Sequence, residues 1–215
     1  MSGVGEAALV IGLISAIITV IDTLSQAYKD SKDASGLPQA FRDVASKLPL
    51  VSETLGTVQQ RMDASNPEQQ LYSALKPVVE DCKSKVERLE KIFEKVLPPA
   101  SSSRFDRYVA AVKAYGKGNM VEDLTKGILR DVQLLSENHG VKAATETQVG
   151  ELAKAIQDLS SIPPSVPQRV WGELYGAHHY GSGAQNIHTG EGDINANSGL
   201  GSQYIGKTMY FGKGF

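Results

Sequence analysis

The chain has 215 residues, of which 41% are hydrophobic and 21% are charged, values that fit one globular domain with a further segment attached. Its formal net charge of −2 gives no general field that would attract nucleic acid. The single cysteine, Cys82, excludes a disulfide framework and a multi-cysteine metal site, and it fits a reducing, cytoplasmic setting.

Composition changes sharply near residue 175. Residues 176–215 hold ten of the 21 glycines and three of the four histidines, but only two acidic and two basic residues. We therefore expect an all-α helical domain over residues 1–160, a proline-rich linker over 161–175, and a different kind of segment over 176–215.

The first predicted helix contains an uncharged, mostly apolar run over residues 7–21, between Glu6 and Asp22. As a helix this run is about 22 Å long, shorter than the ~30 Å hydrocarbon core of a bilayer. An acidic residue precedes it, unlike the basic start of a secretory signal. One stripe of small and polar residues follows the helix at spacings of three and four: Ala8, Gly12, Ser15, Thr19, Asp22, Gln26 and Lys29.

Five further helices follow. The sequence Gly36-Leu37-Pro38 ends the first helix, and Asn66-Pro67 begins the third. The predicted ranges are 39–62, 66–96, 103–115, 120–137 and 147–159, joined by loops that suit a compact bundle. Cys82 falls on an apolar face and is expected to be a buried, inert thiol, while His139 is expected to lie at a helix end.

No catalytic constellation is apparent, because the Asp and Glu residues of these helices are expected on their solvent faces. We therefore predict no enzyme activity, no cofactor and no small-molecule substrate.

The C-terminal segment repeats every nine residues. Each of the three units opens with a Gly-x-Gly pair, at 181/183, 190/192 and 199/201. Between the pairs lie residues that form ladders in stacked strands. The candidate amyloid residues are Gly181, Gly183, Gln185, Asn186, Ile187, Gly190, Gly192, Ile194, Asn195, Asn197, Gly199, Gly201, Gln203, Tyr204 and Ile205.

A short repeat of this kind buries little surface alone, so it gains order by stacking on neighbouring copies. We expect the segment to be disordered until other copies order it into a β-solenoid or cross-β fibril. The alternative is a flexible glycine-rich tail without a function. A calcium-binding roll is disfavoured, because such a repeat needs an Asp in nearly every unit and only Asp193 is present.

Two other patterns in this segment are treated as coincidental. Residues 201–208 match the phosphate-binding pattern G-x4-G-K-[ST], but only seven residues remain after Thr208 to form the helix that this loop must open. His178, His179 and His188 lack a carboxylate or thiol at matching spacing, so no metal site is predicted.

The segments 12–23 (GLISAIITVIDT) and 36–50 (GLPQAFRDVASKLPL) closely resemble the N-terminal domain of fungal NACHT-type NOD-like receptors, a HeLo-like cell-death domain of the SesA type. The repeats resemble the sigma-type amyloid signalling motif of fungal death-pathway proteins. The second repeat departs from that motif, because Glu191 and Asp193 replace neutral residues and Ile194 stands where Gln is expected.

This resemblance implies a programmed-cell-death or heterokaryon-incompatibility effector. A NOD-like receptor with a similar amyloid motif would template residues 181–211, and the resulting homo-oligomeric fibril would bring the helical domains together at cytoplasmic foci. The first helix would then target and disrupt the plasma membrane. The residues implied for that step are Ala8, Gly12, Leu13, Ile14, Ala16, Ile17, Ile18 and Ile21.

Two alternatives stay open. Residues 8, 12 and 16 form a small-xxx-small row that permits close helix approach in lipid, yet residues 7–21 also fit a buried central helix whose polar stripe faces solvent. We expect the buried arrangement in the resting protein. The second alternative is an amyloid-nucleated adaptor that never contacts a membrane.

Overall fold

A computed structural model of the chain describes residues 3–31, 36–65, 69–116, 120–138, 140–141 and 145–167. The chain divides into two compact units, Met1–Val166 and Pro167–Phe215, and the described residues belong almost entirely to the first. Six helices and no strand occur in these described residues, which confirms the predicted all-α domain. The helices are α1 (Gly3–Asp30), α2 (Gln39–Ser65), α3 (Gln69–Val96), α4 (Arg104–Tyr115), α5 (Val121–Glu137) and α6 (Glu146–Ser161).

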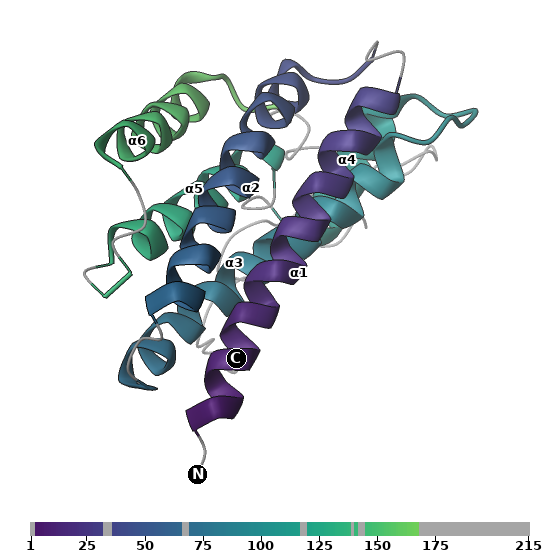
Figure 1. Ribbon diagram of the computed structural model, residues 1–215. Coiled ribbons are helices and arrows are strands. Elements are labelled where there is room, and N and C mark those ends of the chain that lie inside the picture. Colours follow the sequence, from purple (N-terminus) through teal and green to yellow (C-terminus); the bar gives the residue numbers. More distant parts are fainter. Residues whose placement is uncertain are drawn as a thin grey trace, which may run out of the picture. The chain divides into compact units, whose positions relative to one another are not determined.

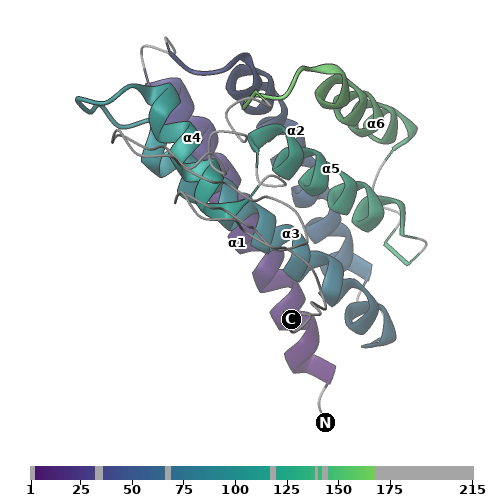
Figure 2. The same cartoon turned by 180° about the vertical axis from the view of Figure 1, so that it is seen from behind.

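The helices form a bundle around α2, α3 and α5. Helix α1 packs against α2 and α3, α6 packs against α5 and α2, and α4 packs against α3. Figure 1 shows α1 on the outside of the bundle, with α6 on the opposite flank, and Figure 2 shows the same arrangement from behind. The sequence suggested a central first helix, but α1 lies at the outside, because no helix among the described residues packs on one of its faces.

Local capping interactions set several helix ends. The hydroxyl of Ser103 accepts a hydrogen bond from the Asp106 amide at the start of α4. Thr145 and Gln148 form a capping box at the start of α6, which satisfies two amides that the helix itself leaves unpaired. Gly36, in the loop between α1 and α2, has a φ of +76°, a conformation that favours glycine.

The core is formed by apolar side chains at helical spacing. On α3 they include Val79, Cys82, Val86, Leu89 and Phe93, all essentially inaccessible to solvent. Three rings form a row across the bundle: Phe41 lies 5.2 Å from Phe93 and 4.9 Å, edge-on, from Tyr108, measured between ring centroids. This row connects α4 through α2 to α3.

The helical unit continues past residue 160, where the sequence predicted that the linker begins. Ser165 and Val166 are buried, and Ser165 is hydrogen-bonded to α5. The start of the proline-rich segment is thus packed on the bundle. The rest of the predicted division, including the repeats of residues 176–215, lies outside the described residues.

Candidate functional site

Helix α1 contacts the bundle through one apolar face. Its buried side chains recur every three or four residues: Val10, Ile14, Ile17, Ile21 and Leu24. Burying an aliphatic side chain of this size stabilises a fold by about 1.5–3 kcal/mol. The five together therefore contribute on the order of 10 kcal/mol to the attachment of α1, as an upper figure for an extended unfolded chain.

The opposite face of α1 is exposed and also largely apolar. Ala8, Gly12 and Ala16 are exposed, and Leu9 keeps 44% of its surface accessible. No charged side chain occurs on this helix between Glu6 and Asp22. An uncharged surface of this length is unusual on the outer side of a surface helix, where polar and charged residues are expected.

Polar contacts fix α1 near its start and middle. The carboxylate of Glu6 accepts hydrogen bonds from the amide of Gln69 and, at 2.9 Å, from the hydroxyl of Ser73, both on α3. The amide of Gln59 on α2 donates to the Ser15 hydroxyl at 2.9 Å, and that hydroxyl donates to the Ile11 carbonyl. These contacts define the register of α1 along α2 and α3.

The structure divides the predicted membrane-targeting residues between the two faces. Ile14, Ile17 and Ile21 are buried, Leu13 and Ile18 are half-buried, and Ala8, Gly12 and Ala16 are exposed. The predicted stripe of small and polar residues does lie at the surface. Its one half-buried member is Ser15, which accepts the hydrogen bond from Gln59. By length and composition the stretch Gly5–Asp30 could cross a membrane, a property that core helices of soluble proteins share. The predicted amyloid residues between 181 and 205 lie outside the described residues.

An open groove of about 320 Å³ lies between the C-terminal halves of α1 and α3. Its floor is apolar, and three carboxylates lie among its lining residues. The lining residues are Thr23, Leu24, Ala27, Asp30, Ser31, Glu90, Phe93, Glu94, Leu97, Pro98 and Pro99. Across the described part of the chain no group of three His, Cys, Asp or Glu side chains is placed to hold a metal ion.

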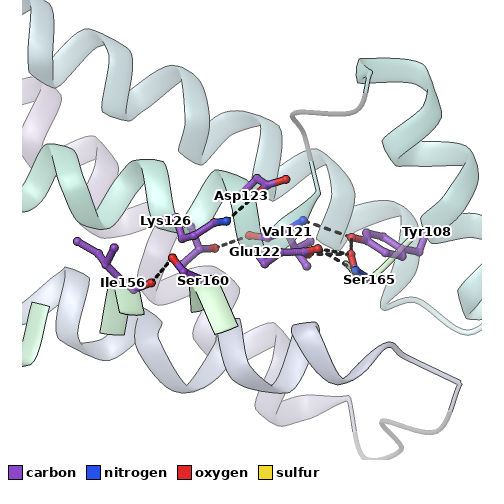
Figure 3. A network of polar contacts seen from close by, with 9 residues as sticks. Tyr108, Val121, Glu122, Asp123, Lys126, Ile156, Ser160 and Ser165 are labelled. Carbon is purple, nitrogen blue, oxygen red and sulfur yellow. Dashed lines mark hydrogen bonds and ion pairs between the residues drawn. The ribbon is translucent and has the colours of Figure 1, made fainter. Parts of the chain in front are cut away.

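A buried polar cluster joins α4, α5 and the segment after α6 (Figure 3). Glu122, in the first turn of α5, is only 3% exposed. Its carboxylate accepts from the Ser165 amide at 2.8 Å, and the Ser165 hydroxyl lies 2.9 and 2.7 Å from its two oxygens. The Ser165 hydroxyl also lies 2.5 Å from the Tyr108 hydroxyl, which accepts from the Val121 amide at 3.3 Å.

The donor and acceptor in each hydrogen bond of this cluster can be assigned from the groups involved. Because the Ser165 hydroxyl donates to the carboxylate, the Tyr108 hydroxyl must be the donor to Ser165. Burial and the adjacent Glu122 carboxylate raise the pKa of Tyr108, so its phenol stays protonated and remains a donor. Met120, at the N-cap of α5, makes no side-chain cap, so the Tyr108 hydroxyl caps the first turn in its place.

A second buried carboxylate lies between α3 and α5. Asp131 is 2.7 Å from the Lys85 ammonium, which also contacts Asp81 on its own helix. Burial alone would lower the pKa of Lys85, but its hydrogen bonds to the two carboxylates outweigh that effect. The pKa is therefore raised above its ordinary value, and the ammonium stays charged. The expectation that acidic residues lie on solvent faces is therefore wrong for Glu122 and Asp131, because each has a partner far away in sequence that satisfies it.

Cys82 is buried beside this ion pair, as predicted. Burial is the main reason that its pKa rises to about 12, so the thiol is not a nucleophile at neutral pH.

A family comparison matches residues 14–135, more than half of the chain, to SesA, described as an N-terminal domain on NACHT NTPases and P-loop NTPases. No curated protein and no solved structure matches the chain. The matched region runs from within α1 almost to the end of α5 and contains the buried face of α1 from Ile14 onward. SesA is a signalling domain of NACHT-type systems and not a catalytic one, which agrees with the cell-death or immune signalling class that the sequence suggested. The chain belongs to the SesA family.

Proposed function

We propose that this protein is a cell-death effector in which assembly of the C-terminal repeats makes α1 available to a membrane. In this proposal a NOD-like receptor with a similar amyloid motif templates residues 181–211. The fibril that grows brings many helical domains together in cytoplasmic foci, and α1 of each domain then enters the plasma membrane.

The observation that carries the proposal is the position of α1. It lies on the outside of the bundle, packs mainly against α2 and α3, and is apolar on both its buried and its exposed face. Detaching α1 into water would expose five buried aliphatic side chains and would cost on the order of 10 kcal/mol. This cost is as large as the whole free energy of unfolding of a typical domain. Detachment therefore requires another apolar environment, and a bilayer supplies one.

The repeats support the first step of the proposal. Their Gln and Asn residues form hydrogen-bonded ladders when copies stack, and the segment carries only two acidic and two basic residues to oppose stacking. Glu191 and Asp193 would bring like charges together in the second repeat of an in-register stack. We therefore expect templating to be stronger at raised ionic strength, where such repulsion is screened.

Dye release from anionic liposomes tests the membrane step. The protein would be seeded with preformed fibrils of residues 176–215, and Ala16→Asp would be compared with the matched control Ala114→Asp. Both alanines are exposed on helices, so each change has a similar small effect on folding. An Asp at the centre of an inserting helix costs about 2.5–3.5 kcal/mol, so roughly a hundredfold loss of insertion is expected for Ala16→Asp alone.

Equal dye release by both variants would refute the role of α1. Fibril formation without any dye release would instead favour the second candidate function, an amyloid-nucleated adaptor whose helical domain recruits another protein. That candidate is supported by the same repeats, but it assigns no role to the apolar outer face of α1.

Fibre diffraction tests the assembly step. Residues 176–215 should form fibrils with the ~4.7 Å spacing of stacked strands. In the full-length protein, replacing Gln185 and Gln203 together by proline should prevent assembly, because proline removes ladder donors. The helical circular dichroism of the bundle should stay unchanged. Persistently monomeric wild-type peptide at high concentration would contradict the proposal.

A further inference from the structure

We propose that residues 162–166 form a releasable strap, whose docking on α5 completes the cap of that helix and whose release is transmitted to α1. The proposal rests on the proposed function only for the source of the pull on the strap, which is assembly of the chain that follows. The strap itself belongs to the helical unit.

The strap is anchored at two adjacent residues. Ser165 supplies both its amide and its hydroxyl to the buried Glu122 carboxylate, and Val166 is 1% exposed. Among the charged groups that the structure describes, none forms an ion pair with Glu122. Donors from the strap and the N-terminal end of α5 are thus what stabilise this carboxylate in place.

The other three strap residues are less buried than Ser165 and Val166, and Ile162 is half-buried. Pro163 and Pro164 are exposed, and the strap contains no helical turn. Ser165 lies near the surface, at 9% exposed, so water can reach Glu122 once the strap moves away. Prolines on both sides of Ser165 restrict the backbone, so a pull on Pro167 acts directly on the Ser165 anchor and not on a slack chain.

Release of the strap has a consequence inside the bundle. The Tyr108 hydroxyl would lose Ser165, its acceptor, while remaining next to the Glu122 carboxylate and the Val121 amide. It would then turn to donate to Glu122, and we expect the ring to shift as the hydroxyl approaches that new acceptor. That ring lies edge-on to Phe41, at 4.9 Å between centroids.

The row of rings reaches α1. Phe41 contacts Phe93, and Phe93 lines the groove together with Leu24 and Ala27 of α1. A shift of Tyr108 would therefore be passed by Phe41 and Phe93 to the groove that Leu24 and Ala27 of α1 also line. Hydrogen exchange is therefore measured at both ends of the row, in α5 and in α1.

Hydrogen exchange on the full-length, unassembled protein tests the strap. Ser165→Asp places a second carboxylate against Glu122 and should expel the strap, whereas Ser161→Asp adds the same charge at an exposed residue that does not contact Glu122. We expect Ser165→Asp to lower protection at the amide of residue 165 and at the Val121 amide by roughly tenfold or more, the scale of one or two lost hydrogen bonds to a charged group. Protection in residues 23–30 of α1 should fall as well, and Ser161→Asp should match the wild type.

Unchanged exchange at Val121 in Ser165→Asp would overturn the strap. Altered exchange at Val121 without any change in α1 would overturn its transmission to α1. If Ser165→Asp unfolds the protein by circular dichroism, Ser165→Ala serves instead, because it removes the hydroxyl contacts and retains the amide; the same two readouts then decide.

A second measurement separates this inference from the proposed function. In fibrils seeded from the repeats, the Ser165 and Val121 amides should lose their protection. Fibrils that release dye while these amides stay protected would overturn the strap and leave the proposed function standing. Absence of fibrils would defeat the proposed function, and the comparison of Ser165→Asp with Ser161→Asp would still decide the strap.

Discussion

Replacing Ile14 by alanine tests how firmly α1 is attached to the bundle. Ile14 is 0% exposed and lies in the middle of the buried face of α1, between Val10 and Ile17. Truncating a fully buried aliphatic side chain to alanine lowers the free energy of unfolding by about 2–5 kcal/mol, through lost burial and the cavity that remains. A central value of about 3 kcal/mol is expected here, a large part of the ~5–15 kcal/mol that stabilises a typical domain.

Urea unfolding of the full-length protein, followed by circular dichroism at low protein concentration, measures this loss. The urea midpoint should fall while the dependence on denaturant stays the same, because the surface exposed on unfolding hardly changes. Leu9→Ala is the matched control on the exposed face of the same helix and should change the free energy by less than about 1 kcal/mol. If Ile14→Ala were as stable as Leu9→Ala, α1 would not be packed as described, and the energetic argument for its release would fail.

Three further predictions concern other parts of the bundle. Because burial raises the pKa of Cys82 to about 12, the native thiol should not react with a thiol reagent at pH 8 and should react once the protein is unfolded; rapid native reaction would contradict its burial. In thermal unfolding, Gly150→Ala should stabilise α6 by about 0.5–1 kcal/mol, since no described atom apart from its chain neighbours and the adjacent helix backbone lies within 4 Å of the added carbon. Gly36→Ala should instead destabilise the protein by about 1–2 kcal/mol because of its positive φ, and equal effects of the two changes would refute this. The hydrogen bond from Lys47 lowers the pKa of Asp158. The stability that this pair contributes is therefore present above the ordinary carboxyl pKa and is lost as the pH falls through the lowered pKa. Asp158→Asn should weaken the acid dependence of unfolding, and an unchanged pH profile would count against the pair.

The helices of this fold were largely predictable from local signals. Apolar periodicity defines α3, and the predicted starts of α4 and α5 differ from the structure by one residue each. Pro49 and Pro77 lie inside α2 and α3, where tertiary packing outweighs the hydrogen bond that each proline removes.

The position of α1 was not predictable from its own composition. A helix rich in Leu, Ile and Val suits a central location, yet α2 and α3 cover only the face that contains Ile14 and Ile17. The stripe that contains Ala8 and Gly12 correctly predicted which face is exposed, but small residues also suit close helix contacts, so periodicity alone does not locate α1 at the outside of the bundle.

The buried cluster was missed for a different reason. Glu122 follows the start of a helix, where a solvent-exposed acidic residue is common, and its partner Ser165 occurs 43 positions later in a segment that reads as a linker. No local pattern connects the two residues. The nearest available signal was Tyr108, because a buried tyrosine needs a partner for its hydroxyl.

The end of the helical unit at Val166 also separates the chain spectroscopically. Its single tryptophan, Trp171, comes after that point, whereas the tyrosine at the centre of the buried cluster, Tyr108, comes before it. Selective excitation of the indole therefore reports on the part of the chain that follows Val166, while amide circular dichroism reports mainly on the helices. The wild-type protein can thus be followed in solution with two intrinsic signals and no attached dye, one for each side of the junction.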